Sequence, residues 1–156
     1  MEHDGNGWVQ CGLGHRHWGR FGAAGLLLHR SADGAGTLIL MQHRAVWTAN
    51  GGTWGIPGGA RDSHESAAQA ALREAGEEAG VRSEDVAVTG EFADDHGAGW
   101  GYTTVLARLV RPFVLVPQEE SEELRWVPVG EVDGLPLHPG FALSWPELRV
   151  RLEHAA

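Results

Sequence analysis

Hydrophobic positions along the chain predict a set of short strands around one central helix. Residues 22–30 carry three consecutive leucines and predict a buried strand, and residues 37–43 predict a second strand after a turn with Asp33-Gly34. Two such runs joined by a short turn are typical of a hairpin. Residues 45–59, rich in Gly, Trp and Pro, predict a loop with little regular structure. Further strands are predicted at 86–92, 102–110 and 125–129, and a last helix at 140–154.

The central helix is predicted over residues 63–79, because small apolar residues recur there at helical spacing. Asp62 with Glu65 three residues later fits a capping box, and Gly80 fits a helix stop. An alanine-rich face suits close packing on a sheet. Strands around a central helix, followed by a final helix, predict an α/β sandwich with a mixed sheet.

The size and composition of the chain fit one globular domain over residues 1–156, with 1–20 as a partly irregular N-terminal extension. Its 156 residues are 42% hydrophobic and 21% charged. No apolar run approaches the ~20 residues that span a bilayer, and the polar, acidic first ten residues do not resemble a secretory signal. We therefore expect a cytoplasmic protein.

The charge pattern restricts the partners and the chemistry. A net charge of -9 argues against nucleic-acid duplexes and anionic membranes as partners. The sequence contains arginine but no lysine, which excludes lysine-based catalysis. Cys11 is the single cysteine, so no intramolecular disulfide forms. Together with His15 and His17 it does not complete a zinc site, and the role of that segment is left open.

Three glutamates of the predicted helix point to a cation site. Glu74, Glu77 and Glu78 are spaced i, i+3 and i+4, so they occupy one arc of the helix and repel each other. A hard divalent cation relieves this repulsion, because Mg²⁺ prefers oxygen ligands. Arg73 lies four residues before Glu77 and can pair with it. The alternative interpretation is a helix face whose glutamates are simply solvated. The spacing of the residues around the three glutamates decides between a cation site and a solvated face.

That wider spacing resembles the signature of the Nudix family. A glycine is followed after five residues by a glutamate, and after seven more by Arg-Glu, then Glu-Glu and a glycine. The matching positions are Gly59, Glu65, Arg73, Glu74, Glu77, Glu78 and Gly80. The preceding segment 54–59 and the later Trp126-Val127-Pro128 extend the resemblance over most of the chain from Phe21 onward. Ala75 departs mildly from the family pattern, which has a bulkier apolar residue there.

The resemblance implies a Nudix-type α/β/α sandwich and a hydrolase that cleaves a diphosphate bond in a nucleoside diphosphate derivative. Glu74, Glu77 and Glu78 would bind Mg²⁺, or Mn²⁺, together with the Gly58 carbonyl. Arg73 would orient the glutamates, while Gly59, Glu65 and Gly80 would be structural. A later glutamate often serves as a further ligand or general base. Glu123 is favoured for this role, then Glu120, with Glu119 and Glu122 as the other candidates.

The sequence does not single out one substrate. Ordinary or oxidised nucleoside triphosphates come first, then ADP-ribose-like compounds and dinucleotides. The candidates for substrate contact are Trp47, Trp100 and Tyr102, whose rings could stack on a base, and Arg44, which could bind phosphate or base. Core or surface positions are the alternative interpretation for each. A non-catalytic nucleotide sensor and an isoprenoid diphosphate hydrolase are the competing functions, and a homodimer is common in the resembling family.

Overall fold

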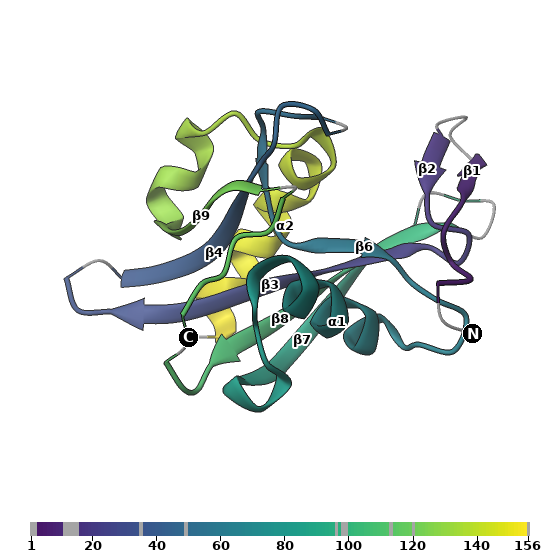
Figure 1. Cartoon of the computed structure of the whole chain (residues 1–156). Coiled ribbons are helices and arrows are strands. Elements are labelled where there is room, and N and C mark those ends of the chain that lie inside the picture. Colours follow the sequence, from purple (N-terminus) through teal and green to yellow (C-terminus); the bar gives the residue numbers. More distant parts are fainter. Residues whose placement is uncertain are drawn as a thin grey trace.

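A seven-stranded mixed sheet forms the middle layer of the molecule (Figure 1). The computed structural model describes residues 3–10, 16–34, 36–48, 50–95, 97, 100–112, 114–119 and 121–155. In chain order the elements are β1 (Trp8–Gln10), β2 (Arg16–Trp18), β3 (Ala23–Ala32), β4 (Gly36–Arg44), β5 (Trp54–Gly55), β6 (Gly58–Ala60), α1 (Ala67–Ala79), η1 (Ser83–Asp85), β7 (Val86–Asp95), β8 (Gly101–Leu109), β9 (Ser121–Pro128), η2 (Val129–Gly134) and α2 (Pro139–Ala155).

The sheet is mixed because one central pair of strands is parallel. The strands lie in the order β5-β4-β3-β8-β7, with β6 also paired to β3 and β9 also paired to β4. β3 and β8 run parallel, while the other pairs described for this sheet are antiparallel. The predicted hairpin of β3 and β4 and the predicted α/β sandwich with a mixed sheet are both confirmed.

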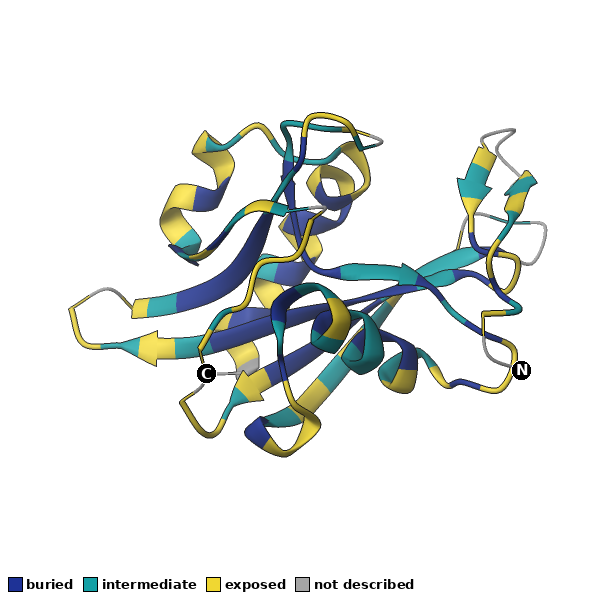
Figure 2. Ribbon diagram, viewed as in Figure 1, coloured by how far each residue is buried: buried dark blue, intermediate teal, exposed yellow. Residues whose placement is uncertain are grey.

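Each face of the sheet is covered by one long helix, and this explains the continuous run of leucines in β3. Leu26 and Leu28 are buried with α1 on one face, whereas Leu27 is buried with α2 on the other. A strand covered on both faces needs apolar residues at every position rather than at alternate ones. Figure 2 shows the resulting band of buried residues along β3 and β4.

Helix α1 begins later than the sequence pattern predicted. Ser66 is the N-cap, and its hydroxyl accepts a hydrogen bond from the Gln69 backbone N–H while the Gln69 side chain returns to the Ser66 backbone. The prediction that Asp62 caps the helix was therefore wrong. Gly80 ends the helix with φ of 77°, as predicted, because glycine adopts the left-handed conformation without strain. The helix packs on the sheet through alanines that are fully buried: Ala70, Ala71, Ala75 and Ala79.

The N-terminal extension is more regular than predicted. β1 and β2 pair as a separate two-stranded sheet, here called the N-terminal ribbon, which stands at the right of Figure 1. Asp62 holds the segment just before the ribbon against the loop before α1. Its carboxylate accepts hydrogen bonds from the backbone N–H groups of His3 and Gly5 at 2.9 and 3.0 Å. Cys11 and His15 lie outside the described residues.

The remaining predicted elements are found with small shifts of their ends. The strands at 86–92, 102–110 and 125–129 correspond to β7, β8 and β9, and the last helix corresponds to α2. The segment 45–59 was predicted as a loop but contributes β5 and part of β6 to the sheet. Within the described part of the chain, no helix combines the length and the apolar character that a membrane crossing requires.

A buried histidine makes the stability of this fold sensitive to acid. His29 in β3 is 5% exposed, and burial, followed by the nearby Arg108 charge, lowers its pKa. Because the unfolded chain then binds the proton more tightly, stability falls as the pH drops below the unfolded pKa of about 6.5.

We predict that His29→Gln costs about 1 kcal/mol at pH 7.5, a typical value for a substitution in a core. The difference from the wild type should shrink as the pH falls to about 5.5, because glutamine takes up no proton. Urea unfolding at both pH values measures this. The exposed His154→Gln is the matched control, and an unchanged difference for His29→Gln would contradict the assignment.

Candidate active site

A cavity of about 720 Å³ gathers side chains from distant parts of the chain. Glu74 and Glu78 of α1 line it together with Gly58 and Gly59 of β6. The N-terminal ribbon and the first turns of α2 contribute other parts of its wall. Acidic side chains beside a glycine-rich strand therefore face a space large enough for a small molecule.

Arg73 organises the acidic residues around the cavity. Its guanidinium donates to both carboxylate oxygens of Glu65, at 2.7 and 2.9 Å, and to the Ala60 carbonyl at 2.9 Å. It also reaches Glu74 at 2.9 Å and Glu77 at 3.5 Å. The pair with Glu77 was predicted from the spacing, but Glu65 is the closer partner. A bidentate contact with a largely buried carboxylate fixes the guanidinium more firmly than a single exposed contact does.

Glu65 is bound from several sides. Besides Arg73, it accepts a hydrogen bond from the Asp62 backbone N–H at 2.9 Å, and Arg61 donates to its carbonyl at 2.6 Å. The hydrogen bonds from Arg73 lower the pKa of Glu65, although burial opposes this effect. Glu65 is 8% exposed and thus ties the loop before α1 to the helix itself.

Glu74 and Glu78 face the backbone of β6. The Glu78 carboxylate accepts a hydrogen bond from the Gly58 N–H at 2.9 Å and another from the Gln42 side chain at 3.3 Å. A Cβ on Gly59 would stand 2.6 Å from the carboxyl carbon of Glu74, so only glycine leaves room for that carboxylate. Burial raises the pKa of Glu74, and the nearby Glu77 charge acts in the same direction.

These residues fit a hydrated divalent cation. The carboxylates of Glu74 and Glu78 are neighbours and are partly removed from water, so they need either a proton or a cation between them. Mg²⁺ binds through one or two carboxylates while keeping several waters. Among the described residues, no group of three or more His, Cys, Asp and Glu side chains is placed to hold an ion by itself. Arg73 holds Glu74 and Glu77, whereas Gly58 and Gln42 hold Glu78. The arrangement therefore suits an open site rather than a closed cage.

Gln42 is a site residue that the sequence analysis missed. It is 1% exposed, and its amide nitrogen donates to Glu78 and to the Ser121 hydroxyl, the latter at 2.7 Å. Its amide oxygen has no hydrogen-bond partner within the described structure. A signal was present, because Gln42 is the polar residue in the apolar run 38–42 of β4, on the same face as Leu40.

The predicted substrate-contact residues separate into two groups. Arg44, Trp100 and Tyr102 line the cavity, whereas its described wall does not include Trp47, which is 65% exposed. Trp100 is 6% exposed and donates from its indole N–H to the Gly19 carbonyl at 2.9 Å.

Tyr102 lies against glycines of two strands. Its hydroxyl would stand 2.1 Å from a Cβ on Gly25 and 2.8 Å from one on Gly58. Burial raises the pKa of Tyr102, and the nearby Glu78 charge adds to this effect. The hydroxyl therefore stays neutral beside the acidic residues.

Glu123, the favoured general base, lies on the other face of the sheet. Its carboxylate accepts two hydrogen bonds from Arg125 at 3.0 Å, and the Arg125 guanidinium stands over the Trp54 ring, which is buried on the α2 side. The next residue, Leu124, is buried on the α1 side. The structure thus does not bring Glu123 to Glu74 and Glu78. Glu120 lies outside the described residues.

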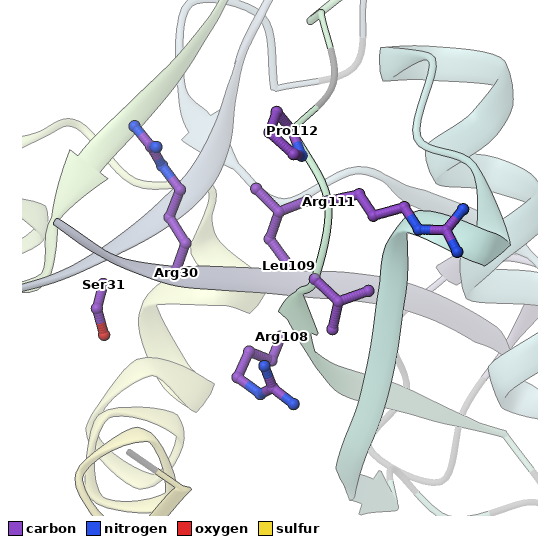
Figure 3. A pocket seen from close by; sticks show the side chains of 7 residues that line it. Arg30, Ser31, Arg108, Leu109, Arg111 and Pro112 are labelled. Carbon is purple, nitrogen blue, oxygen red and sulfur yellow. The ribbon is translucent and has the colours of Figure 1, made fainter.

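A second hollow of about 370 Å³ lies at the far ends of β3 and β8 (Figure 3). Arg30, Arg108 and Arg111 line it, but Figure 3 shows their guanidinium groups pointing in different directions. Arg30 stands over the Trp126 ring at 4.8 Å. The three charges do not converge on one ligand position, so the acidic cavity is the better candidate for an active site.

Comparisons with known proteins agree with this choice. Residues 19–145 match the family model described as NUDIX domain. The chain is 51% identical over 152 residues to the Mycobacterium tuberculosis protein named "Putative 8-oxo-dGTP diphosphatase 3", over 94% of this chain and 70% of that protein. It is 45% identical to a nucleoside triphosphate pyrophosphatase/Nudix hydrolase fusion protein of Bifidobacterium longum, over 97% of this chain and 32% of the fusion protein.

Solved structures show the same similarity. A Nudix hydrolase from M. smegmatis has a TM-score of 0.89 and 49% sequence identity, and the match covers 96% of each chain. A C. elegans Ap4A hydrolase has a TM-score of 0.69 at 22% identity, over 85% of this chain and 98% of that one. The second match shows a shared fold alone.

The network around Arg73 yields a stability prediction. Glu65→Gln should lower the free energy of unfolding by about 2–3 kcal/mol at pH 7.5, because it breaks a largely buried ion pair and leaves the guanidinium without its main partner. Glu147→Gln is the matched control, since it breaks the exposed pair with Arg151 and should cost at most about 0.5 kcal/mol. Chemical denaturation measures both. Equal losses in the two variants would contradict the anchoring role of Glu65.

Proposed function

The chain belongs to the Nudix family of pyrophosphohydrolases, and from that premise we propose that it hydrolyses a diphosphate bond in a nucleoside diphosphate derivative with Mg²⁺. The observation that carries this proposal is the joint position of Glu74 and Glu78 beside Gly58 and Gly59 in the large cavity. Acidic residues in this position suit a substrate whose phosphates are neutralised by a divalent cation.

An oxidised purine nucleoside triphosphate is the substrate that we propose first. A relative with 51% identity over 94% of this chain bears the name 8-oxo-dGTP diphosphatase, qualified as putative. The products would be a nucleoside monophosphate and pyrophosphate. Ordinary nucleoside triphosphates, ADP-ribose-like compounds and dinucleotides are the other substrates in this class. An isoprenoid diphosphate is the remaining alternative, and Asn6 and Arg44 in the cavity wall offer polar contacts that a hydrocarbon tail would not use.

The glutamates of α1 are the proposed cation ligands. Glu74, Glu77 and Glu78 would hold the ion with the Gly58 carbonyl, and Mn²⁺ would serve in place of Mg²⁺. When bound, such an ion neutralises phosphate charge and makes a water molecule a better nucleophile. The open arrangement of the carboxylates leaves coordination positions for water and phosphate oxygens.

The surrounding residues position these glutamates. Arg73 holds Glu74 and Glu77, and its own position is fixed by Glu65. The Gly58 N–H donates a hydrogen bond to one carboxylate oxygen of Glu78 and the Gln42 amide donates to the other, which orients the Glu78 carboxylate. Arg44 lines the same cavity and offers a permanent positive charge to phosphate or base. Pre-organised groups of this kind accelerate a reaction because they need no rearrangement in the transition state.

The hydrolytic step requires one water molecule and one broken P–O bond. The water oxygen adds to a phosphorus, its proton passes to a basic group, and the bridging oxygen leaves with the other phosphate. Glu123 is poorly placed to take that proton, because it is paired with Arg125 and is not among the described residues that line the cavity. The α1 glutamates are the better candidates, and Glu77 has the most exposed side chain among them, at 52%.

A non-catalytic nucleotide sensor is the second candidate, and hydrolysis assays separate it from an enzyme. The purified protein is incubated with oxidised and ordinary triphosphates, ADP-ribose, dinucleoside polyphosphates and isoprenoid diphosphates, with and without Mg²⁺. Metal-dependent release of products from one class supports the hydrolase. Nucleotide binding without turnover, with Mn²⁺ also tested, supports the sensor. A cytoplasmic location and a homodimer also stay proposals, and light scattering tests the latter.

Two glutamine substitutions test the placement of the chemistry. Glu78→Gln should reduce kcat by about 10²–10³-fold, as expected when one pre-organised charged group is removed. Glu123→Gln is the matched control, and kcat should stay within about twofold of the wild type because Glu123 is paired with Arg125 and does not belong to the described wall of the cavity. Steady-state kinetics with unfolding curves measures both. Full activity of Glu78→Gln, or a large loss in Glu123→Gln, would contradict the proposal.

A further inference from the structure

The N-terminal ribbon adds residues to the cavity wall that lie outside the part of the chain that matches the family model. The family match begins at residue 19, yet His17 and Trp18 of β2 line the same cavity as Glu74 and Glu78. We propose that this ribbon forms the base-binding wall of the active site, with Trp18 stacking on the aromatic base of a nucleotide. This inference rests on the proposed function and names the part of the substrate that the ribbon recognises.

The ribbon is fixed to the body of the protein, as a binding wall must be. The Trp100 indole N–H donates to the Gly19 carbonyl at the end of β2, at 2.9 Å, and the Ser63 N–H donates to the Asp4 carboxylate at 2.8 Å. Asp62, which binds the backbone of Gly5, also lies 3.8 Å from the Arg73 guanidinium. The ribbon is thus connected to the residues that position Glu74. This connection defines the distance between the ribbon and the α1 glutamates, where the substrate phosphates would bind.

The wall that the ribbon builds is aromatic. His17 stacks on Trp100 with ring centroids 3.8 Å apart and planes inclined by 13°. Trp18 is 45% exposed although it lines the cavity, and it meets Trp8 edge to face at 5.4 Å. Trp100 and Tyr102 are poor stacking surfaces by comparison, since His17 covers one face of Trp100 and the Tyr102 hydroxyl is held against glycines.

The chemistry of this wall favours a nucleobase over the other groups that a diphosphate can carry. Flat rings stack well on a base, whose two faces are π surfaces, and the Asn6 amide nearby can meet its polar edge. Phosphate groups belong instead near the α1 glutamates, where a cation would neutralise them. The ribbon therefore binds the base of the nucleotide, and the glutamates of α1 bind its reacting phosphates through the cation.

The ribbon itself supplies a matched control. Trp8 and Trp18 are cross-strand partners, so replacing either by alanine removes the same ring contact, but only Trp18 lines the cavity. Trp18→Ala and Trp8→Ala are compared by calorimetric titration with guanosine 5′-monophosphate and, separately, with inorganic pyrophosphate. The monophosphate has a base and no diphosphate bond, so no turnover disturbs the titration. Unfolding curves establish that both variants fold.

We expect Trp18→Ala to weaken binding of the monophosphate about tenfold, the usual effect of removing an aromatic ring from a stacked base. Binding of pyrophosphate should change less than twofold, and Trp8→Ala should bind both probes as the wild type does. In steady-state assays with a triphosphate substrate, Trp18→Ala should raise KM about tenfold and leave kcat within about twofold.

The proposal is overturned if Trp18→Ala binds the monophosphate as the wild type does, if the wild type does not bind it, or if Trp8→Ala shows an equal loss. An equal loss for pyrophosphate also overturns it, because the ribbon would then shape the phosphate end. A protein that binds the base through Trp18 but hydrolyses nothing would contradict the proposed function alone. Hydrolysis with an unchanged KM in Trp18→Ala would contradict the base-binding wall alone.

Discussion

The ion pair between Arg73 and Glu65 is the contact on which the site depends. It joins α1 to the loop before it, and the same guanidinium holds Glu74 and Glu77. Asp62 in that loop also fastens the N-terminal segment. The Arg73 guanidinium therefore sets the relative positions of the glutamates, the glycine-rich strand β6 and the ribbon. The pair is largely buried, so its geometry is better defined than that of a surface ion pair.

The sheet provides the second constraint, because it separates two chemically different faces. On the α1 side, Leu40 and Gln42 lie on the same face of β4, and Gln42 directs Glu78. On the α2 side, His43 stacks on Trp54 with ring centroids 4.6 Å apart, next to the pair formed by Glu123 and Arg125. The large cavity receives residues from both sides, since Glu74 and Glu78 of α1 line it together with the first turns of α2, whereas the pair formed by Glu123 and Arg125 does not belong to its described wall.

Most strands and both long helices could be predicted from the sequence, because local patterns encode them. The three leucines of β3 and the stop at Gly80 are examples. The start of α1 could not be decided locally, since Asp62 with Glu65 and Ser66 with Gln69 both fit a capping box and lie four residues apart. The side of Glu123 is set by its register in the sheet, where it pairs with His43 of β4 and the next residue, Leu124, is buried on the α1 side. The ribbon depends on contacts between residues more than fifty positions apart, such as Gly5 with Asp62, which no local pattern reveals.

The central claim is that Glu74 and Glu78 form a cation site whose geometry is set by Arg73, Gly58 and Gln42. The most direct test is Mn²⁺ binding, followed by water-proton relaxation without any substrate, in the wild type, Glu78→Gln and Glu123→Gln. The account predicts that the wild type and Glu123→Gln bind Mn²⁺ alike, and that Glu78→Gln binds at least about tenfold more weakly while remaining folded. Equal Mn²⁺ binding in all three proteins, or none in the wild type, would contradict it.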